Sequence, residues 1–522
     1  MIKGLFCRVV NYSTQVNQNV SSDRFMFQGW IKSIRPASKS WVFMTVSDCK
    51  QDVQLVIEKN TFNGDFTSID SLSEESVVRV EGILKERPQK HQTEKQAQEV
   101  HVRNLEILNR ASKLPLVMNE NLLPDEELRM KYRYLDLRRP TLNKNIRLRS
   151  KVIQDMRNHL HALEFVEIET PLLFKSTPEG AKEYMVDAGK EGKMYALPQS
   201  PQQFKQLLVI GGFEKYFQVA KCFRNEDLRA DRQPEFTQLD IEMGFAGQDG
   251  VIKLIEGLLT DVWIRNGLSK PVFRTLTYKE AMRCCGSDKP AYLDRFLIKS
   301  LPGTNHGHVT EELYLPKELV DDSLIKLFKE DLQEGTLDRS LIEDTNNYSF
   351  KVTRDENCNV GKTLLGKARL AAISKLNLPV NLHEFLWVVD FPLFTGSIEQ
   401  LVSMHHPFTA PNGAITENPL HAKALHYDLV LNGTEIGGGS VRIHDAHLQE
   451  KIFRDYLRLP EEKIQLFDHL LQALRHGAPP HAGIALGLDR LLALMCGTSS
   501  IRDVIAFPKN GSGYDPLFKT PS

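Results

Sequence analysis

Residues 222–243 read CFRNEDLRADRQPEFTQLDIEM, and this stretch decides how the chain is interpreted. It joins two apolar runs with strand character, residues 216–220 and 239–245. Between them arginines stand among carboxylates, and an arginine can hold a phosphate or carboxylate group through two parallel hydrogen bonds. Phe236 adds a flat ring on which a base can stack. The pattern predicts two strands and a connecting loop that bind a flat, phosphorylated ligand; a salt-bridged surface loop is the alternative.

The same residues resemble a known family. FRNE is typical of motif 2 of the class II aminoacyl-tRNA synthetases, and DLRADRQPEFTQ is similar to the form found in bacterial and mitochondrial aspartyl-tRNA synthetases. GIALGLDRLLALMCG, beginning at Gly483, resembles motif 3. The helix expected at about 141–163 and the strand FVEIETPLL after it resemble motif 1, the family's dimer interface. The resemblance implies an α+β multidomain fold, with an N-terminal OB-fold β-barrel and a class II antiparallel-sheet catalytic domain that carries a short insertion domain.

The domain order follows from changes in pattern along the chain. Short runs with period-two alternation over 24–110 favour a small antiparallel β-barrel of the oligonucleotide-binding type, and a barrel without a ligand is the alternative. Prolines and mixed charge indicate a hinge after it. The predicted order is a candidate transit peptide (1–20), the OB-fold anticodon-binding domain (21–112), the hinge (113–140), the first part of the catalytic domain (141–285), a reduced insertion domain (286–384), and the second part of the catalytic domain with a C-terminal tail (385–522).

The implied reaction calls for arginines and carboxylates rather than a catalytic triad. An amino-acid carboxylate attacks the α-phosphate of ATP, and the first step depends on alignment and charge neutralisation. The resemblance implies that Arg224 and Arg490 are the catalytic residues, with Arg224 on the α-phosphate and Arg490 over the adenine and on the γ-phosphate. It implies further ATP contacts at Asn225, Glu226 (the adenine amine), Gln233, Phe236 (stacking), Glu435, Gly487, Leu488 and Asp489.

Two carboxylates flank a tight turn downstream. Asp428 and Glu435 stand on either side of Asn432-Gly433, a dipeptide typical of two-residue β-hairpin turns. A hairpin would bring both acids near one point, where their oxygens suit Mg²⁺ bound to triphosphate oxygens. We therefore expect a Mg²⁺ site at this pair; surface acids beside an ordinary turn are the alternative.

An aspartate substrate requires cations at a fixed reach from its side-chain carboxylate. The resemblance implies that Lys205 and Arg442 hold that carboxylate and that His405 closes over it. A neutral asparagine would leave the two cations incompletely paired, which disfavours its binding. The family pattern places further aspartate contacts, mainly acceptors for the α-ammonium group, at Glu179 in the lid STPEGA, Ser200, Gln202 and Asp240.

The barrel residues that match the family's anticodon-reading positions are less regular. Arg35 can stack or bind phosphate, Phe43 can stack on a base, and Gln54 and Glu99 can hydrogen-bond base edges. Trp41 competes with Phe43 for the stacking position. The expected partner is tRNA-Asp.

The composition and the N-terminal segment indicate the class of protein and its compartment. The chain has 522 residues and a formal net charge of −1, but residues 129–157 form a local basic band. No apolar run approaches the roughly 20 residues that span a bilayer, and the scattered cysteines predict free thiols. The N-terminal segment is apolar and hydroxyl-containing, with no acid before Asp23, which predicts import into the mitochondrial matrix; a cytoplasmic enzyme is the alternative.

The sequence thus predicts a homodimeric aspartate–tRNA ligase that uses ATP, Mg²⁺ and L-aspartate. The alternatives are a catalytically silent paralogue that binds tRNA and an enzyme that amidates aspartate on the same fold. Arg224, Glu435 and Arg490 are all present, which argues against the first, and the N-terminal barrel argues against the second.

Overall fold

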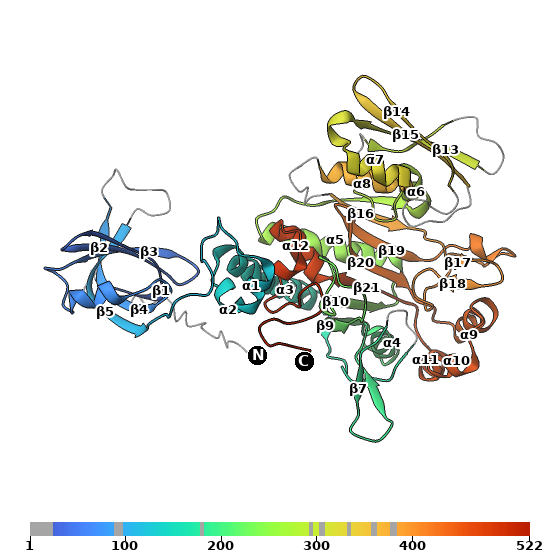
Figure 1. The fold of residues 1–522 in the computed structure, drawn as a ribbon. Coiled ribbons are helices and arrows are strands. Elements are labelled where there is room, and N and C mark those ends of the chain that lie inside the picture. The colour runs from blue at the N-terminus through green and yellow to red at the C-terminus, as the bar shows by residue number, and fades with distance from the viewer. Residues whose placement is uncertain are drawn as a thin grey trace. The chain divides into compact units, whose positions relative to one another are not determined.

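The computed structural model describes residues 24–87, 98–177, 182–291, 296–301, 308–330, 336–355, 363–375 and 384–521. The chain divides into two compact units, residues 1–144 with 516–519 and residues 145–515 with 520–522. Each unit has its own sheet and hydrophobic core (Figure 1). Within the described ranges, no helix is long and apolar enough to cross a membrane.

The first unit contains the expected five-stranded barrel. Its strands close in the order β1-β2-β3-β5-β4, and only β3 and β5 pair in parallel. Side chains alternate along each strand, so that Val42, Met44 and Val46 fill the barrel while Trp41 and Phe43 face outward, half-buried. The strands are β1 (Phe25–Ser38), β2 (Trp41–Ser47), β3 (Asp52–Glu58), β4 (Val77–Glu86) and β5 (Gln98–Asn109), and the 3-10 helix η1 spans Phe66–Ser71.

The stretch predicted as a hinge contains two short helices, α1 (Glu126–Lys131) and α2 (Arg133–Asp136). The Asp125 side chain accepts a hydrogen bond from the Leu128 N–H and so caps α1. Asp136 is fully buried, and it forms ion pairs with Arg133 (2.8 Å) and Arg139 (3.0 Å). Two arginines of the basic band, Arg133 and Arg139, are therefore buried and paired with Asp136.

The second unit is built on an eight-stranded sheet in the order β11-β16-β19-β20-β21-β10-β9-β6. All neighbours pair antiparallel except the outermost pairs, β11 with β16 and β6 with β9. The predicted strand FVEIETPLL is reduced to the two residues of β6, and residues 168–171 have no regular secondary structure. The strands are β6 (Val166–Glu167), β9 (Lys215–Phe223), β10 (Glu235–Gly244), β11 (Val272–Thr277), β16 (Glu384–Val389), β19 (His426–Leu431), β20 (Thr434–Val441) and β21 (His481–Gly487).

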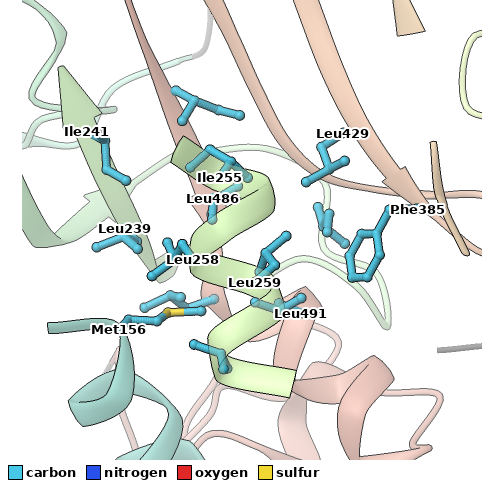
Figure 2. Close-up of a cluster of buried hydrophobic side chains, with 14 of the residues drawn as sticks. Met156, Leu239, Ile241, Ile255, Leu258, Leu259, Phe385, Leu429, Leu486 and Leu491 are labelled. Carbon is cyan, nitrogen blue, oxygen red and sulfur yellow. The ribbon is translucent and has the colours of Figure 1, made fainter. Parts of the chain in front are cut away.

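Three helices bury one face of this sheet: α3 (Pro140–Ala162), α5 (Gln248–Arg265) and α12 (Leu488–Cys496). Figure 2 shows side chains of α5 and of the strands pointing into the shared core. Leu239 and Ile241 of β10 are fully buried there. Burying one such side chain contributes about 1.5–3 kcal/mol. Because side chains alternate along a strand, the residues between them, such as Asp240, point to the opposite face, which remains available for polar chemistry.

The predicted insertion has a small fold of its own. A four-stranded sheet in the order β12-β13-β15-β14 packs with α7 and α8 around a separate hydrophobic cluster. Its elements are β12 (Lys299–Ser300), β13 (His308–Pro316), η4 (Lys317–Leu319), α7 (Asp322–Glu330), β14 (Thr336–Glu343), β15 (Asn347–Asp355) and α8 (Leu364–Ser374). The chain enters it from α6 (Tyr278–Cys285) and leaves it into β16.

Smaller elements surround the open face of the large sheet (Figure 1). The helix α4 contacts β9 and β10 and brings polar side chains to that face. The remaining elements are β7 (Met185–Asp187), β8 (Met194–Ala196), α4 (Gln202–Ile210), β17 (Phe394–Gly396), β18 (Leu401–Ser403), η5 (Pro419–His421), α9 (Ala446–Lys451), the π-helix η6 (Ile452–Tyr456), α10 (Glu461–Gln465), α11 (Asp468–Arg475) and η7 (Ile501–Asp503).

Candidate active site

A cleft of about 700 Å³ lies over the polar face of the large sheet. Strands β10, β19, β20 and β21 form its floor, and α4 and the 224–234 connection contribute to its walls. Every sequence-predicted catalytic and substrate residue in the described ranges lines it except Asn225 and Leu488. Residues far apart in the chain thus meet at one site. The predicted residues that line it are Ser200, Gln202, Lys205, Arg224, Glu226, Gln233, Phe236, Asp240, His405, Asp428, Glu435, Arg442, Gly487, Asp489 and Arg490.

One end of the cleft holds a closed network of buried charges. Lys205 donates to Asp240 Oδ1 (2.9 Å) and lies 3.4 Å from Glu242 Oε2. Arg442 grips the same Glu242 carboxylate with two nitrogens, at 2.9 and 3.1 Å. Burial raises the pKa of Glu242, but Arg442 and Lys205 more than offset that effect and hold the pKa below its usual value. Two cations and two carboxylates therefore balance one another before any substrate enters.

Some buried polar atoms at this site, among them Arg224 Nε, Asp240 Oδ2 and His405 Nε2, have no hydrogen-bond partner within the described part of the chain. Most buried polar atoms in proteins are hydrogen-bonded, and leaving one unpaired costs about 1–3 kcal/mol. A donor on Arg224 and an acceptor on Asp240 are therefore available to a ligand that occupies the cleft.

The predicted closing histidine belongs to a stacked pair. The rings of His405 and His426 lie 3.4 Å apart at an angle of 13°, and the edge of the pair packs against Phe391. His426 Nε2 is 2.8 Å from Asp428 Oδ1. Burial lowers the pKa of both histidines to about 3, so both rings are neutral near pH 7. The stack therefore adjoins the acidic pair through Asp428.

The other end of the cleft carries partly exposed charges in looser pairs. Arg224 lies over the Phe236 ring at 5.2 Å and so covers the predicted stacking surface. Arg490 pairs with Asp231 at 3.1 Å, and Arg232 pairs with Glu226 at 2.9 Å. Exposed pairs of this kind are worth only about 0–1 kcal/mol each. A charged ligand can therefore replace these partners at little cost.

The predicted hairpin is confirmed, and it brings the acidic pair together. Asn432 and Gly433 form the turn between β19 and β20 with φ values of 51° and 79°, a conformation that favours Asn-Gly. A Cβ atom on Gly438 would lie 2.7 Å from Asp428 Oδ1 and 3.6 Å from Glu435 Oε1, so both carboxylates converge on that point. Burial raises the pKa of each acid.

The barrel presents its predicted residues on its outer surface. Arg35 of β1 lies directly opposite Phe43 of β2, so the two side chains share one face. Gln54 accepts a hydrogen bond from Arg87, and Arg87 also lies 3.6 Å from Glu99. Arg87, which sequence reasoning missed, thus ties together the two residues predicted to read base edges.

Comparison with known proteins shows the family to which this chain is similar. A family model described as "tRNA synthetases class II (D, K and N)" matches residues 125–511, and one described as "OB-fold nucleic acid binding domain" matches residues 25–108. The mitochondrial aspartate–tRNA ligase of Mus musculus is 41% identical, over 94% of this chain and 84% of that protein. The chain belongs to the aspartate–tRNA ligase family. A relative from Dictyoglomus turgidum, named aspartate–tRNA(Asp/Asn) ligase, is 37% identical over 99% of this chain and 96% of its own.

A solved structure supports the fold alone. The asparaginyl-tRNA synthetase of Pyrococcus horikoshii, crystallised with asparaginyl-adenylate, superposes with a TM-score of 0.65 at 20% identity and covers 93% of this chain and 94% of its own. The predicted class II architecture with an N-terminal OB-fold barrel is confirmed. As a member of the aspartate–tRNA ligase family, the chain is an aminoacyl-tRNA synthetase.

Several predicted contacts have other roles in the structure of this family member. Leu488 lies fully buried in the core, and the Asn225 N–H donates to the Lys182 carbonyl outside the cleft lining. Gln233 exchanges two hydrogen bonds with the Lys509 backbone, at 3.0 and 2.7 Å. Asp489 pairs with Arg149 and accepts from the Thr237 N–H at 2.9 Å. Gln233 and Asp489 therefore have partners within the chain, and contact of the four residues with ATP stays a prediction. Glu179 falls outside the described residues.

The residues that sequence reasoning missed in or beside this ligase-family cleft include Glu242, His426 and Lys289. Glu242 was detectable, since it stands two residues after Asp240 and must share its face of β10. His426 had a weaker signal of the same kind, two residues before Asp428 on β19. Lys289 had none, because it lies at the entrance to the insertion, far from both acids in the sequence.

Proposed function

We propose that the cleft joins L-aspartate to ATP as aspartyl-adenylate and then transfers aspartate to the 3′ end of tRNA-Asp, with release of pyrophosphate and AMP. The observation that carries this proposal is the set of unpartnered buried atoms, Arg224 Nε and Asp240 Oδ2, in a cleft whose other charges are already paired. Asp240 would accept from the α-ammonium group. Arg224 would hold the α-phosphate in line with the attacking carboxylate.

Selectivity for aspartate would come from the buried charge network. The side-chain carboxylate would share Lys205 and Arg442 with Glu242, whose two oxygens both lie near these cations. Asparagine has the same shape but no charge, and its amide would present donors to groups that can only donate. Its rejection would then rest on unsatisfied buried polar groups, a penalty that can discriminate strongly. Ser200 and Gln202 line the same end and would contact the bound aspartate.

ATP would occupy the exposed end. Its adenine ring would displace Arg224 from Phe236 and stack there, with Arg490 on the opposite side and Glu226 near the adenine amine. The oxygens of Asp428 and Glu435 fit Mg²⁺, which takes one or two protein carboxylates and fills its remaining positions with water and phosphate. Consistent with that pattern, the described residues contain no cluster of three or more His, Cys, Asp or Glu side chains suited to a metal. When bound, Mg²⁺ would neutralise charge on the triphosphate.

The barrel would read the anticodon of tRNA-Asp through Arg35, Phe43, Gln54 and Glu99. Their shared outer surface suits stacking and base-edge hydrogen bonds. We also propose a homodimer, because α3 and β6 resemble the dimerisation motif of the family. Changing the middle anticodon base should reduce charging about 100-fold while leaving adenylate formation intact; equal losses in both would contradict the assignment.

One assay tests the central proposal: charging of purified tRNA-Asp and tRNA-Asn, each with aspartate and with asparagine. We expect aspartate on tRNA-Asp and no asparagine on either tRNA. Aspartate on tRNA-Asn as well would place this chain beside its Dictyoglomus turgidum relative in tRNA range. Charging with asparagine would refute the pocket assignment.

We further propose a mitochondrial location, which the mouse relative's name supports and the Dictyoglomus turgidum relative's name does not address. The predicted leader, residues 1–20, lies outside the described residues. A reporter fused to residues 1–40 should enter mitochondria, and a diffuse cytosolic signal would refute import.

A further inference from the structure

Lys289 reaches into the acidic pair from the entrance to the insertion. Its ammonium lies 3.3 Å from Glu435 Oε2, 4.0 Å from Asp428 Oδ2 and 2.8 Å from Asp288 Oδ2. It also lines the cleft. The structure thus places a lysine ammonium, a cation, against both acids of the pair.

This position is fixed by close packing at the backbone. The α6 helix ends at Gly286 with φ of 61°, and a Cβ atom there would lie 2.8 Å from Gly366 in α8. The Thr363 N–H donates to the Gly286 carbonyl at 2.8 Å. The Lys289 N–H then donates to the hydroxyl of Ser287, a fully buried residue, at 3.1 Å. The segment that carries Lys289 is thus anchored on the insertion rather than free in solvent.

The insertion also touches the hairpin that carries the acids. A Cβ atom on Gly433, in the turn, would lie 3.3 Å from the Ala291 Cβ atom and 3.5 Å from Leu370 of α8. Figure 1 shows α6 and α8 beside the β16 and β19 side of the large sheet. The segment 286–291 therefore bridges α8 and the hairpin turn, which sets the distance from Lys289 to Asp428 and Glu435.

Two carboxylates that converge in a half-buried site repel each other unless a cation is near. A divalent ion bound by both acids would lie close to the Lys289 ammonium, which is 3.3 Å from Glu435 Oε2 and 4.0 Å from Asp428 Oδ2. We propose that Lys289 is a built-in counter-cation of the Asp428–Glu435 pair, which holds the two acids together before metal binds and competes with the divalent cation for them. This inference rests on the proposed metal site and deepens it.

The competition can be measured without catalysis. Mn²⁺, which prefers the same oxygen ligands, would be titrated into nucleotide-free protein and followed by electron paramagnetic resonance. Lys289→Met should bind Mn²⁺ at least about tenfold more tightly than the wild type, because a positive charge within 4 Å is removed from the site. Lys289→Arg should bind within about twofold of the wild type, as should Lys423→Met, which removes an exposed lysine paired with Asp390 at 3.1 Å.

A double variant separates this inference from the metal site itself. Adding Glu435→Gln to Lys289→Met should abolish the gain in Mn²⁺ affinity. If Mn²⁺ binding in the presence of ATP depends on Glu435 but Lys289→Met has wild-type affinity, the counter-cation role is overturned and the proposed metal site stands. If Glu435→Gln has no effect on Mn²⁺ binding in the presence of ATP, both the counter-cation role and the proposed metal site are refuted.

Folding gives a second readout. Lys289→Met leaves two carboxylates without their cation, so its thermal midpoint should fall, and Glu435→Gln in the same chain should restore most of the loss. If Lys289→Met alone does not fold, recovery of folded protein in the double variant supports the role. Failure of Glu435→Gln to recover any stability would overturn it.

Discussion

The two ends of the cleft differ in how deeply their charged side chains are buried and how tightly they are paired. At the buried end, which we assign to aspartate, Lys205, Asp240, Glu242 and Arg442 have side chains exposed by 5% or less and are paired with one another. At the other end, which we assign to the nucleotide, Arg490 and Asp231 are 28% and 49% exposed, and Arg232 and Glu226 are 42% and 35% exposed. The first arrangement pre-organises a site of fixed size and charge. The second leaves groups that a large, flexible triphosphate can rearrange.

Because the charged pairs at the two ends differ in burial, mutations at the two ends should lower the free energy of unfolding by different amounts. Removing one member of a buried pair leaves its partner buried and unpaired, which typically costs 3–5 kcal/mol, whereas breaking an exposed pair costs about 0–1 kcal/mol. Substitutions at the aspartate end should therefore affect both binding and stability. Substitutions at the nucleotide end should affect ATP use alone.

The largest effect is expected for Arg442→Leu. The substitution removes a cation for the substrate carboxylate and leaves Glu242 with Lys205 alone. Aspartate-dependent ATP–pyrophosphate exchange should fall by a factor of about 100 to 1,000 or more, and the free energy of unfolding should fall by roughly 3 kcal/mol. Arg442→Lys, which keeps the charge but loses the two-nitrogen grip, should fall between the variant and the wild type. Near-normal exchange in Arg442→Leu would refute the pocket assignment.

A smaller effect, confined to ATP, is expected for Arg490→Ala. The KM for ATP in the exchange reaction should rise roughly 10- to 100-fold, as for loss of a charge-assisted contact, while unfolding stability changes by less than about 1 kcal/mol. Asp231→Asn is the matched control, since it frees Arg490 from its 3.1 Å pair and should not raise that KM. A loss of stability as large as that of Arg442→Leu would break the contrast between the two ends.

The smallest effect is a pH dependence at the aspartate end. The folded-state pKa of Glu242 lies below its unfolded value of about 4.3, so its contribution to stability is present above that pH and is lost as pH falls through the folded pKa. The difference in unfolding free energy between the wild type and Glu242→Gln should be constant from pH 7 to about 5 and shrink below about 4.

Urea unfolding of the wild type and of Glu242→Gln, from pH 7 to below pH 4, measures this difference in unfolding free energy. Glu226→Gln, at the exposed end, serves as the comparison and should differ little from the wild type at any pH. A Glu242→Gln difference that does not change with pH would contradict the lowered pKa.

Most of the fold could be predicted from local patterns, whereas most of the cleft residues were predicted from the resemblance to a known family. The β-hairpin at Asn432-Gly433 was predictable because a two-residue turn of this type requires positive φ at both positions, and Asn-Gly adopts that conformation readily. The strands around 224–234 and the helix near 141–163 were predictable from hydrophobic periodicity. The strand FVEIETPLL was overestimated, because an apolar run does not reveal whether a neighbouring strand continues beside it.

Some of the site could not be predicted in the same way. Leu488 stands between Gly487 and Asp489, which line the cleft, but its side chain is buried in the core, because successive residues of a helix point about 100° apart. The pairing of Glu242 with Arg442 and the stack of His405 on His426 join residues from different strands and loops. Only the register of those strands brings them together.

The sequence by itself determined which chemical groups the chain brings to its substrates, because motif spacing, turn residues and strand periodicity act over a few neighbouring residues. The tertiary structure decided how those groups balance one another. Sheet order placed Glu242 between Lys205 and Arg442, and packing of the insertion against the hairpin placed Lys289 beside Asp428 and Glu435. Electrostatic pairing depends on distances of a few ångströms between distant parts of the chain, and only packing sets those distances.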